Sequence, residues 1–186
     1  MDKRTQNTRE RIRHAYVTLL TAGDEPKLTV TALARQANID RKTFYLHYDT
    51  TDDVMLDITQ QIVEQFVEKL KQRGFLEKGV DVGVFYQTLG QVISEHRALF
   101  HYAALRPSQY VFWEHIKHEL AVRLVEHYQD KFLIKPDGLY VYLRFLLGGM
   151  QEIYREWLRG GLKLTIEELS RMAGDAAFEG FSSILK

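Results

Sequence analysis

The chain of 186 residues contains no cysteine, which excludes disulfide bonds and metal sites built on thiolates. No run of apolar residues approaches the roughly 20 that a membrane-spanning helix needs. The amino terminus is polar and charged, so it does not resemble a secretory signal peptide. These absences predict a cytoplasmic protein that does not enter a membrane.

Sequence motifs of catalysis are also missing. The chain has no Gly-x-Ser-x-Gly motif, no Gly-x-Gly-x-x-Gly and no phosphate-binding Gly-Lys-Ser/Thr loop. Glu114, His115, His118 and Glu119 could suggest a metal site, but no third ligand follows at a recognisable spacing, and surface histidines on a charged helix explain them as well. We therefore predict that the protein is not an enzyme and has no metal or cofactor.

Helical periodicity runs through the chain without an alternating strand pattern, and 45% hydrophobic residues suffice for real cores. We predict an all-α fold of about nine helices, with one domain at 1–50 and a second at 51–186. A helix from 51 to 74 links them. Breaks at 74–79, 106–107 and 135–138 divide the rest into helices over 82–93, 98–105, 111–128, 139–159 and 166–185, the last one begun by a capping box of Thr165 and Glu168.

A segment near the amino terminus has the pattern of two short helices joined by a tight turn. Thr29 is a residue type that starts a helix, and Asn38 stands where a left-handed backbone ends it. Asp40 then caps the second helix, and Ile39 can pack on Phe44 as a hydrophobic staple. This layout predicts a helix-turn-helix, preceded by a helix from about Thr8 to Ala22.

The outer face of the second helix is rich in hydrogen-bond donors. Arg41 and Lys42 lie in its first turn and can donate to the O6 and N7 acceptors of guanine, so we predict that they contact bases. Thr43, Tyr45 and His47 end in a hydroxyl or imidazole suited to phosphate oxygens. An ordinary solvated surface helix is the alternative, but the cap, staple, turn and donor face agree with one another.

Residues 29–56, TVTALARQANIDRKTFYLHYDTTDDVML, resemble the signature of the TetR/AcrR family of bacterial transcriptional regulators. The resemblance implies an all-helical dimer with an amino-terminal three-helix DNA-binding domain and a larger ligand-binding and dimerising domain. The DNA contacts that it implies are Thr31, Arg41 and Lys42 to bases, and Thr43, Tyr45, His47 and Thr29 to phosphates.

Three positions depart from the family pattern. The turn usually has Gly-Val and here has Asn38 and Ile39, which is tolerable because Asn accepts a left-handed backbone. The aromatic residue after the histidine is usually Phe and here is Tyr48. The family usually offers Ser-Lys-Glu where residues 51–53 are Thr-Asp-Asp, so a lysine that would help to hold DNA is absent, and we expect weaker or differently salt-dependent binding.

The net charge of zero conceals an asymmetry. Residues 1–50 hold nine Lys or Arg against six Asp or Glu, and the remainder has the opposite excess. This division suits DNA binding by one end only. Five basic residues at the start could form an arm that enters the minor groove, or could simply be solvated: Lys3, Arg4, Arg9, Arg11 and Arg13.

Small residues in the last two helices suggest close approach by partner helices. We predict a four-helix interface between two copies, with packing inside one subunit as the alternative. The predicted interface residues are Gly148, Gly149, Ala173, Ala177, Gly180 and Phe181. The stretch GGMQEIYREWLRGGLKLTIEEL also resembles the carboxy-terminal pattern of DhaS-like regulators.

The carboxy-terminal part is rich in aromatic residues, and the family resemblance implies a pocket there for a small hydrophobic or aromatic effector. Tyr102 and Tyr142 are preferred because a buried phenol needs a partner. An ordinary aromatic core is the alternative reading. The candidate pocket residues are Phe66, Phe85, Tyr102, Phe112, Trp113 and Tyr142.

The sequence thus predicts a ligand-responsive dimeric transcriptional regulator, a repressor, that binds a pseudo-palindromic DNA operator. Two alternatives remain open at this point. The protein could be an activator, or a DNA-binding regulator controlled by a protein partner, as the DhaS-like pattern allows. A helical ligand-binding or enzymatic domain that never binds DNA is disfavoured by the donor face of residues 41–47.

Overall fold

The computed structural model describes residues 3–22, 28–77, 80–106 and 109–178, and within these ranges the chain forms nine α-helices, one short 3-10 helix and no strand. The all-α prediction is confirmed. The chain divides into two compact units, residues 1–60 and 61–186, here called the amino-terminal and carboxy-terminal units. The boundary lies inside a helix rather than at the residue 50 expected from the sequence. None of the helices in the described ranges is long and apolar enough to span a membrane.

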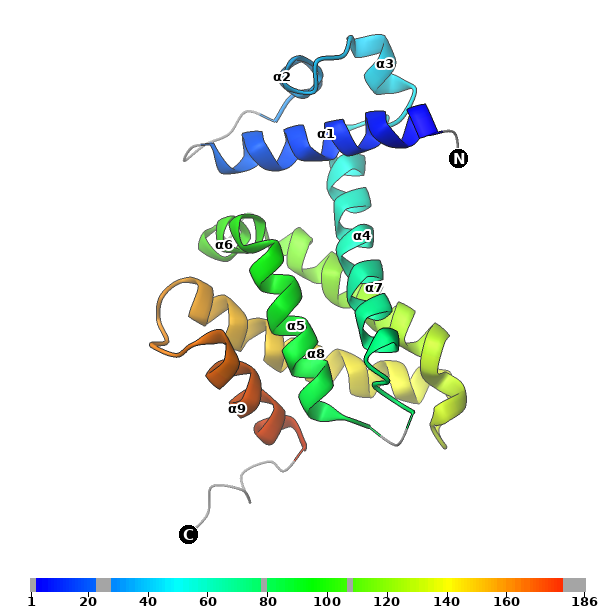
Figure 1. The fold of residues 1–186 in the computed structure, drawn as a ribbon, viewed down its shortest axis with the longest axis vertical. Helices are drawn as coiled ribbons and strands as arrows, with labels where there is room; N and C mark the ends of the chain where they lie inside the picture. Colours follow the sequence, from blue (N-terminus) through cyan, green and yellow to red (C-terminus); the bar gives the residue numbers. More distant parts are fainter. Residues whose placement is uncertain (1–2, 23–27, 78–79, 107–108, 179–186) are drawn as a thin grey trace. The chain divides into compact units, whose positions relative to one another are not determined.

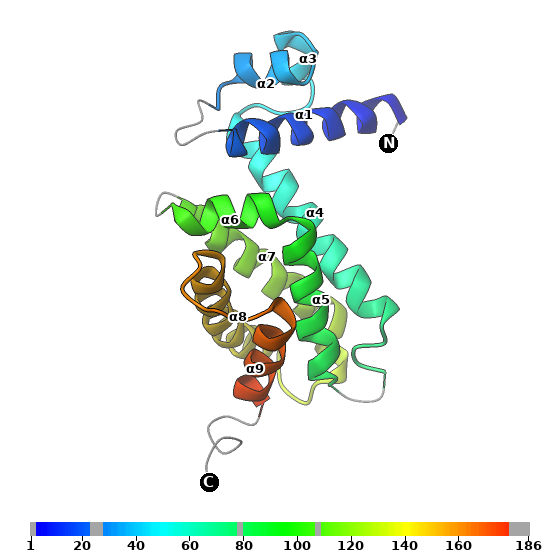
Figure 2. The same cartoon turned by 60° about the vertical axis from the view of Figure 1, so that its left-hand side comes forward.

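The amino-terminal unit contains three complete helices and the start of a fourth: α1 (Lys3–Thr21), α2 (Val30–Gln36), α3 (Arg41–Tyr45) and the first residues of α4 (Thr51–Gln72). In Figures 1 and 2, α2 and α3 lie along one side of α1. One fully buried residue comes from each helix: Ile12, Leu33, Phe44 and Val54 all have zero exposure. These four side chains form the centre of a small core that holds α3 in place.

The predicted helix boundaries in this unit are confirmed at three positions. The Thr29 hydroxyl accepts a hydrogen bond from the Ala32 amide at 3.1 Å, and an Asp40 carboxylate oxygen accepts one from the Thr43 amide at 2.7 Å. Asn38 has φ of 51°, the left-handed conformation that the turn requires. Helix α1 begins at Lys3, earlier than the expected Thr8, and the glycine expected to end it, Gly23, lies outside the described residues.

The carboxy-terminal unit contains the rest of α4 and six further elements: α5 (Val82–Glu95), α6 (Arg97–Leu105), α7 (Tyr110–Tyr128), η2 (Gln129–Lys131), α8 (Pro136–Leu158) and α9 (Ile166–Phe178). Helices α5 and α9 lie side by side, as do α7 and α8 (Figures 1 and 2). A Cβ atom on Gly90 of α5 would lie 2.8 Å from the Ser170 hydroxyl of α9, so only glycine permits this approach. Ser170 in turn hydrogen-bonds the Tyr154 hydroxyl at 2.8 Å.

Two helix ends in this unit differ in their agreement with the sequence prediction. The Thr165 and Glu168 capping box is confirmed, because each residue accepts a hydrogen bond from the other's amide. The break expected over 135–138 is wrong in part. Pro136 occupies the first turn of α8, where its fixed φ suits a helix and its missing amide is no loss. The expected end of the last helix near Leu185 lies outside the described residues.

Candidate nucleic-acid interface and ligand cavity

The donor-rich face of α3 points away from the core of the amino-terminal unit. Phe44 is fully buried, whereas Tyr45 is 48% exposed and Arg41 and Lys42 are also exposed. Thr31 on α2 is exposed as well. All three residues predicted to contact bases are therefore accessible from outside the unit.

The residues predicted to contact phosphates are less uniform. Thr29 and Tyr45 are exposed, whereas Thr43 and His47 are half-buried. Partial burial, together with the nearby Arg9 guanidinium, lowers the pKa of His47 below its usual value, so the imidazole is neutral near pH 7. A neutral imidazole can still donate one hydrogen bond to a phosphate oxygen.

Three arginines of α1 brace this unit instead of extending from it as an arm. Arg13 donates to an Asp57 carboxylate oxygen at 2.9 Å, and Arg9 lies 3.2 Å from the other oxygen of the same carboxylate. Arg11 donates to the backbone carbonyls of Ala37 and Asn38, at the turn between α2 and α3. The reading of these three arginines as part of a minor-groove arm is therefore wrong, because their guanidinium groups bind other residues of the same unit. The side chains of Lys3 and Arg4 lie outside the described residues.

Tyr48 joins the same cluster, and sequence analysis missed its role. Its hydroxyl donates to Asp57 and accepts from the Arg9 Nε at 3.3 Å, and the Arg9 guanidinium stacks 5.0 Å from its ring centre. Burial alone raises the pKa of Asp57, but hydrogen bonds from Tyr48 and Arg13 and the charges of both arginines outweigh it, so the pKa lies below its usual value. The ionised Asp57 carboxylate on α4 therefore holds two arginines of α1 and Tyr48, which lies three residues after α3.

The start of α4 shows how the acidic residues at 52 and 53 are used. Asp53 accepts hydrogen bonds from the Thr50 amide at 2.7 Å and from the Thr50 hydroxyl at 2.9 Å. The Thr50 hydroxyl in turn accepts a hydrogen bond from the Asp53 amide at 3.2 Å, so the two residues form a capping box at the start of α4. Negative charge in a first helical turn is also stabilising. Asp52 is exposed and has no such role among the described contacts. The consequence that the missing lysine has for DNA affinity stays a prediction.

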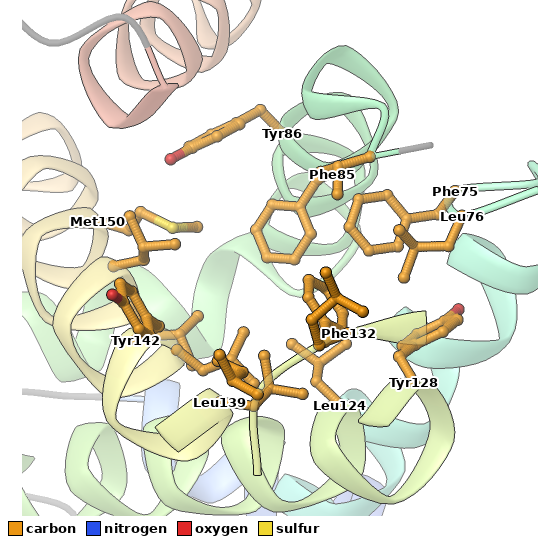
Figure 3. Close-up of a pocket in the computed structure, with 16 residues that line it drawn as sticks. Phe75, Leu76, Phe85, Tyr86, Leu124, Tyr128, Phe132, Leu139, Tyr142 and Met150 are labelled. Carbon is orange, nitrogen blue, oxygen red and sulfur yellow. The ribbon is translucent and has the colours of Figure 1, made fainter. Parts of the chain in front are cut away.

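A cavity of about 350 Å³ lies in the carboxy-terminal unit. Figure 3 shows Tyr86, Phe85, Phe75 and Leu76 along one side, Leu139, Leu124, Phe132 and Tyr128 along the other, and Met150 at one end. None of the described residues that line it carries a charge, and its only polar side-chain groups are the hydroxyls of three tyrosines. A concave, largely apolar site of this size is typical of small-molecule pockets.

A second, smaller cavity of about 60 Å³ lies between α4, α5, α7 and α8. It shares Leu147 and Met150 with the larger cavity, so these two side chains contact both spaces. Trp113 and Gln151 also line the smaller cavity. Gln151 is only 8% exposed although it is polar.

The six predicted pocket residues divide into three pairs. Phe85 and Tyr142 line the larger cavity, Phe66 and Trp113 line the smaller one, and Tyr102 and Phe112 line neither. Phe112 instead packs edge-on against Trp113, as part of the core. Tyr142 is 65% exposed, so its selection as a buried phenol is wrong even though it touches the cavity.

The sequence analysis missed the cavity residues that flank helix ends, such as Phe75, Phe132 and Ile134. The apolar side chains close to Gly74 and Pro136 could have indicated these residues, because apolar residues in an apparent loop suggest that the loop is buried.

The small residues of α8 and α9 have different surroundings. A Cβ atom on Gly148 or Gly149 would meet nothing within 4 Å, so α8 can be approached closely at this point. Ala173 is 5% exposed, so it packs inside its own subunit. Its expected place in an interface between two copies is therefore not supported. Ala177 is half-buried, and Gly180 and Phe181 lie outside the described residues.

The exposed face of α8 is strongly apolar. Val141 is 66% exposed, Tyr142 65% and Phe145 80%, and these positions share a helix face with Gly149. Met172 on α9 is 50% exposed. Contiguous exposed apolar side chains on a folded unit mark a surface that binds something else.

The stretch that resembled a metal site is used in ion pairs. Glu114 lies 2.5 Å from the Lys117 ammonium and 3.0 Å from the Arg144 guanidinium, and the His118 ring shares a hydrogen bond with the Tyr140 hydroxyl at 2.9 Å. In the described part of the chain, no three His, Cys, Asp or Glu residues are placed so that they could hold a metal ion.

No family model matches this sequence, and no curated protein matches it either. Solved structures do match. The fatty acid degradation regulator FadR from Bacillus halodurans is 16% identical, with a TM-score of 0.67 over 92% of this chain and 98% of that one. The dihydroxyacetone kinase operon activator DhaS is 13% identical, with a TM-score of 0.63 over 95% of this chain and 97% of that one.

A third match is FadR from Thermus thermophilus, a TetR-family transcriptional repressor solved in complex with lauroyl-CoA. It is 20% identical to this chain, with a TM-score of 0.61 over 92% of this chain and 94% of that one. Each of the three similarities covers nearly the whole of both chains, so both units and their order along the sequence are shared. The resemblance seen around α2 and α3 is thus confirmed at the level of the fold, and the chain has the fold of the TetR-family transcriptional regulators.

Proposed function

We propose that this protein is a ligand-responsive, homodimeric transcriptional regulator that binds a pseudo-palindromic DNA operator. The observation that carries the proposal is the outward donor face of α3, held by a capped and ion-paired scaffold. Arg41 and Lys42 are exposed beside the Asp40 cap, as base contact from the first turn of a recognition helix requires. Thr31 adds a base contact, and Thr29, Thr43, Tyr45 and His47 bind phosphates.

Two copies associate through the apolar face of α8. Phe145, at 80% exposure, is the centre of that face, and the open backbone at Gly149 admits a partner helix. A twofold interface buries the same patch on both copies and so sets two α3 helices against a palindromic site. The protein therefore binds its operator with one reading helix per half-site.

The effector is a small hydrophobic molecule held in the larger cavity. The cavity has the volume of a small-molecule pocket, and none of the described residues that line it is charged, which fits an apolar body. The structurally similar FadR from Thermus thermophilus was solved with lauroyl-CoA, whose acyl chain has this chemistry. Because this cavity is concave and apolar, a small molecule is favoured over a protein partner as the controlling signal.

The proposed coupling between effector and operator runs through α8 and α4. Tyr142 lines the cavity and lies on the exposed face of α8, so a ligand that moves it changes the proposed dimer contact. Phe66 of α4 lines the smaller cavity, and α4 continues from there to Asp57 in the amino-terminal unit. A ligand that prefers one dimer geometry must weaken or strengthen operator binding reciprocally. We assign the protein as a repressor that its effector releases.

The function is tested with operator DNA that the purified protein selects from a random pool. Fluorescence anisotropy should show tight binding to the selected sequence and weak, salt-sensitive binding to random DNA. Phe145→Glu should give monomers in sedimentation and operator binding about 100-fold weaker, whereas Tyr110→Glu, a change at a residue 60% exposed on α7, should leave the dimer intact. No sequence enrichment in the selected pool would contradict the proposal.

An activator is the second candidate for the sign of regulation, because the similar DhaS is an operon activator. A repressor and an activator share the fold and the DNA contacts. A reporter gene behind the selected operator separates them, since deletion of the regulator raises expression for a repressor and lowers it for an activator.

A further inference from the structure

Gln151 is a polar residue buried without a partner. It is 8% exposed, and its Oε1 atom accepts no hydrogen bond from any described residue. A buried amide oxygen that loses its water without gaining a donor costs free energy, so such a residue is uncommon in a solid core. Gln151 lines the smaller cavity through a flexible side chain, so a rotation of its amide would turn Oε1 toward a donor placed there.

The other polar groups at the smaller cavity already have partners. The Tyr154 hydroxyl bonds Ser170 at 2.8 Å, and the Lys117 ammonium pairs with Glu114. Among the described polar residues at this cavity, Gln151 is therefore the one with an unpaired acceptor, its Oε1 atom.

The two cavities adjoin at Leu147 and Met150, which line both of them. Methionine is unbranched and changes rotamer at low cost, so a rotation of Met150 would open a path between the two spaces. A molecule in the larger cavity would then reach Gln151, the next residue of α8, with its tip.

We propose that the effector is an uncharged amphiphile whose apolar body fills the larger cavity and whose single hydroxyl or similar donor binds the Gln151 amide in the smaller one. This inference rests on the proposed function, because it names the ligand class of the proposed effector site. A charged ligand is disfavoured inside, because among the described lining residues none at the larger cavity is charged and Lys117 at the smaller cavity is paired with Glu114. An ionic head group could be carried only outside these cavities.

The full-length protein tests this with a spectroscopic reporter in the smaller cavity. The chain has two tryptophans, and Trp157→Phe leaves Trp113, which lines that cavity, as the reporter. In this background, 1-octanol, 1-decanol and 1-dodecanol and the methyl ether of each are titrated while Trp113 fluorescence is recorded. The ether keeps the chain but lacks the donating O–H.

Gln151→Leu is the decisive variant, because leucine retains the approximate volume of the side chain and removes the amide. With Gln151 present, each alcohol should bind about five- to tenfold more tightly than its ether, the expected worth of one neutral hydrogen bond. In Gln151→Leu the two should bind about equally. Gln61→Leu, at an exposed position of α4, should retain the preference for the alcohol.

An alcohol-to-ether ratio that is the same with and without Gln151 overturns the proposal, because the amide would then bind only a buried water. Absence of any Trp113 response to the alcohols up to their solubility limit overturns it as well. These readouts require no DNA. If the protein shows the Gln151-dependent preference but selects no operator, the ligand site stands and the proposed function fails. If it binds an operator without that preference, the proposed function stands and the ligand site fails.

Discussion

The two units of this protein differ in how their interiors are held together. In the amino-terminal unit, zero-exposure residues of four helices meet without a described gap between them, and Asp57 ties three further side chains into one charged cluster. In the carboxy-terminal unit, aromatic and aliphatic side chains surround about 350 Å³ of open space. Buried polar atoms there, such as the Tyr128 hydroxyl and the Gln151 Oε1 atom, have no hydrogen-bond partner among the described residues. The first arrangement presents a fixed surface, whereas the second leaves room for a guest and can respond to it.

The difference matches what each unit is proposed to bind. A DNA duplex has a regular groove, so the side chains that enter it benefit from being held in one position before they bind. An effector must change the populations of two conformations of the regulator, so it has to bind one of them more tightly than the other. A cavity whose side chains can move allows such a difference in affinity.

Asp57→Ala should have the largest effect, because it leaves Arg9, Arg13 and Tyr48 without their shared acceptor. We expect a loss of about 3 kcal/mol in the free energy of unfolding, the cost typical of removing one member of a buried ion pair. Urea denaturation followed by circular dichroism measures it. Asp52→Ala, at an exposed position of the same helix, is the control and should change the free energy of unfolding by less than about 0.5 kcal/mol. Equal losses in the two variants would remove the cluster as the brace of the unit.

Arg41→Ala should weaken binding to the selected operator by about 2 kcal/mol and binding to random DNA by much less, because it removes a base contact. Tyr45→Phe should weaken both by similar amounts, because it removes a phosphate contact. Anisotropy titrations on both DNAs measure the two ratios. If Arg41→Ala lowers affinity for the two DNAs to the same extent, Arg41 contacts the backbone rather than a base.

Enlarging a side chain should distinguish the packed interior from the open one. Leu33→Phe places extra atoms in the fully buried centre of the amino-terminal unit and should cost about 1 to 2 kcal/mol of stability. Leu143→Phe places the same atoms against the open cavity and should cost less than about 1 kcal/mol, while it weakens decanol binding. Thermal and urea unfolding report the stabilities. A larger loss for Leu143→Phe would show that the cavity is not available space.

The smallest expected effect is a dependence of stability on pH. The pKa of Asp57 is lower in the folded protein than in an unfolded chain, so its stabilisation is complete above about pH 4 and is lost as the pH falls through the folded value. Between about pH 5 and about pH 2.5, the Asp57→Asn variant should therefore lose less stability than the parent protein. Parallel acid dependence in the two proteins would show that other carboxylates account for all of it.

Agreement between the predicted and observed structures follows the distance over which each signal acts. Thr29, Asn38 and Asp40 act on backbone groups at most three residues away, so their roles as caps and turn are visible in the sequence. The sequence identifies Tyr48 only as a departure from the family pattern. Its importance arises from Arg9, which is 39 residues away along the chain.

The carboxy-terminal unit shows the opposite case. Tyr142 and Gln151 both lie on α8, yet the tyrosine is exposed and the glutamine is buried, the reverse of what their residue types suggest. Helical spacing identifies which residues share a face, but it does not say whether that face meets a neighbour, a cavity or solvent. Ala173 is likewise buried only because α9 packs against other helices of its own unit.

The sequence by itself therefore determined the helical class, the caps and turn of the helix-turn-helix and the donor face of α3, because these depend on neighbouring residues and on a repeating local pattern. Only the tertiary structure decided that Arg9, Arg11 and Arg13 brace the fold, that α8 presents an open apolar face, and that a cavity remains beside Gln151. Each of these depends on which distant helices come together and how much space their side chains leave, and that is set by packing over the whole unit.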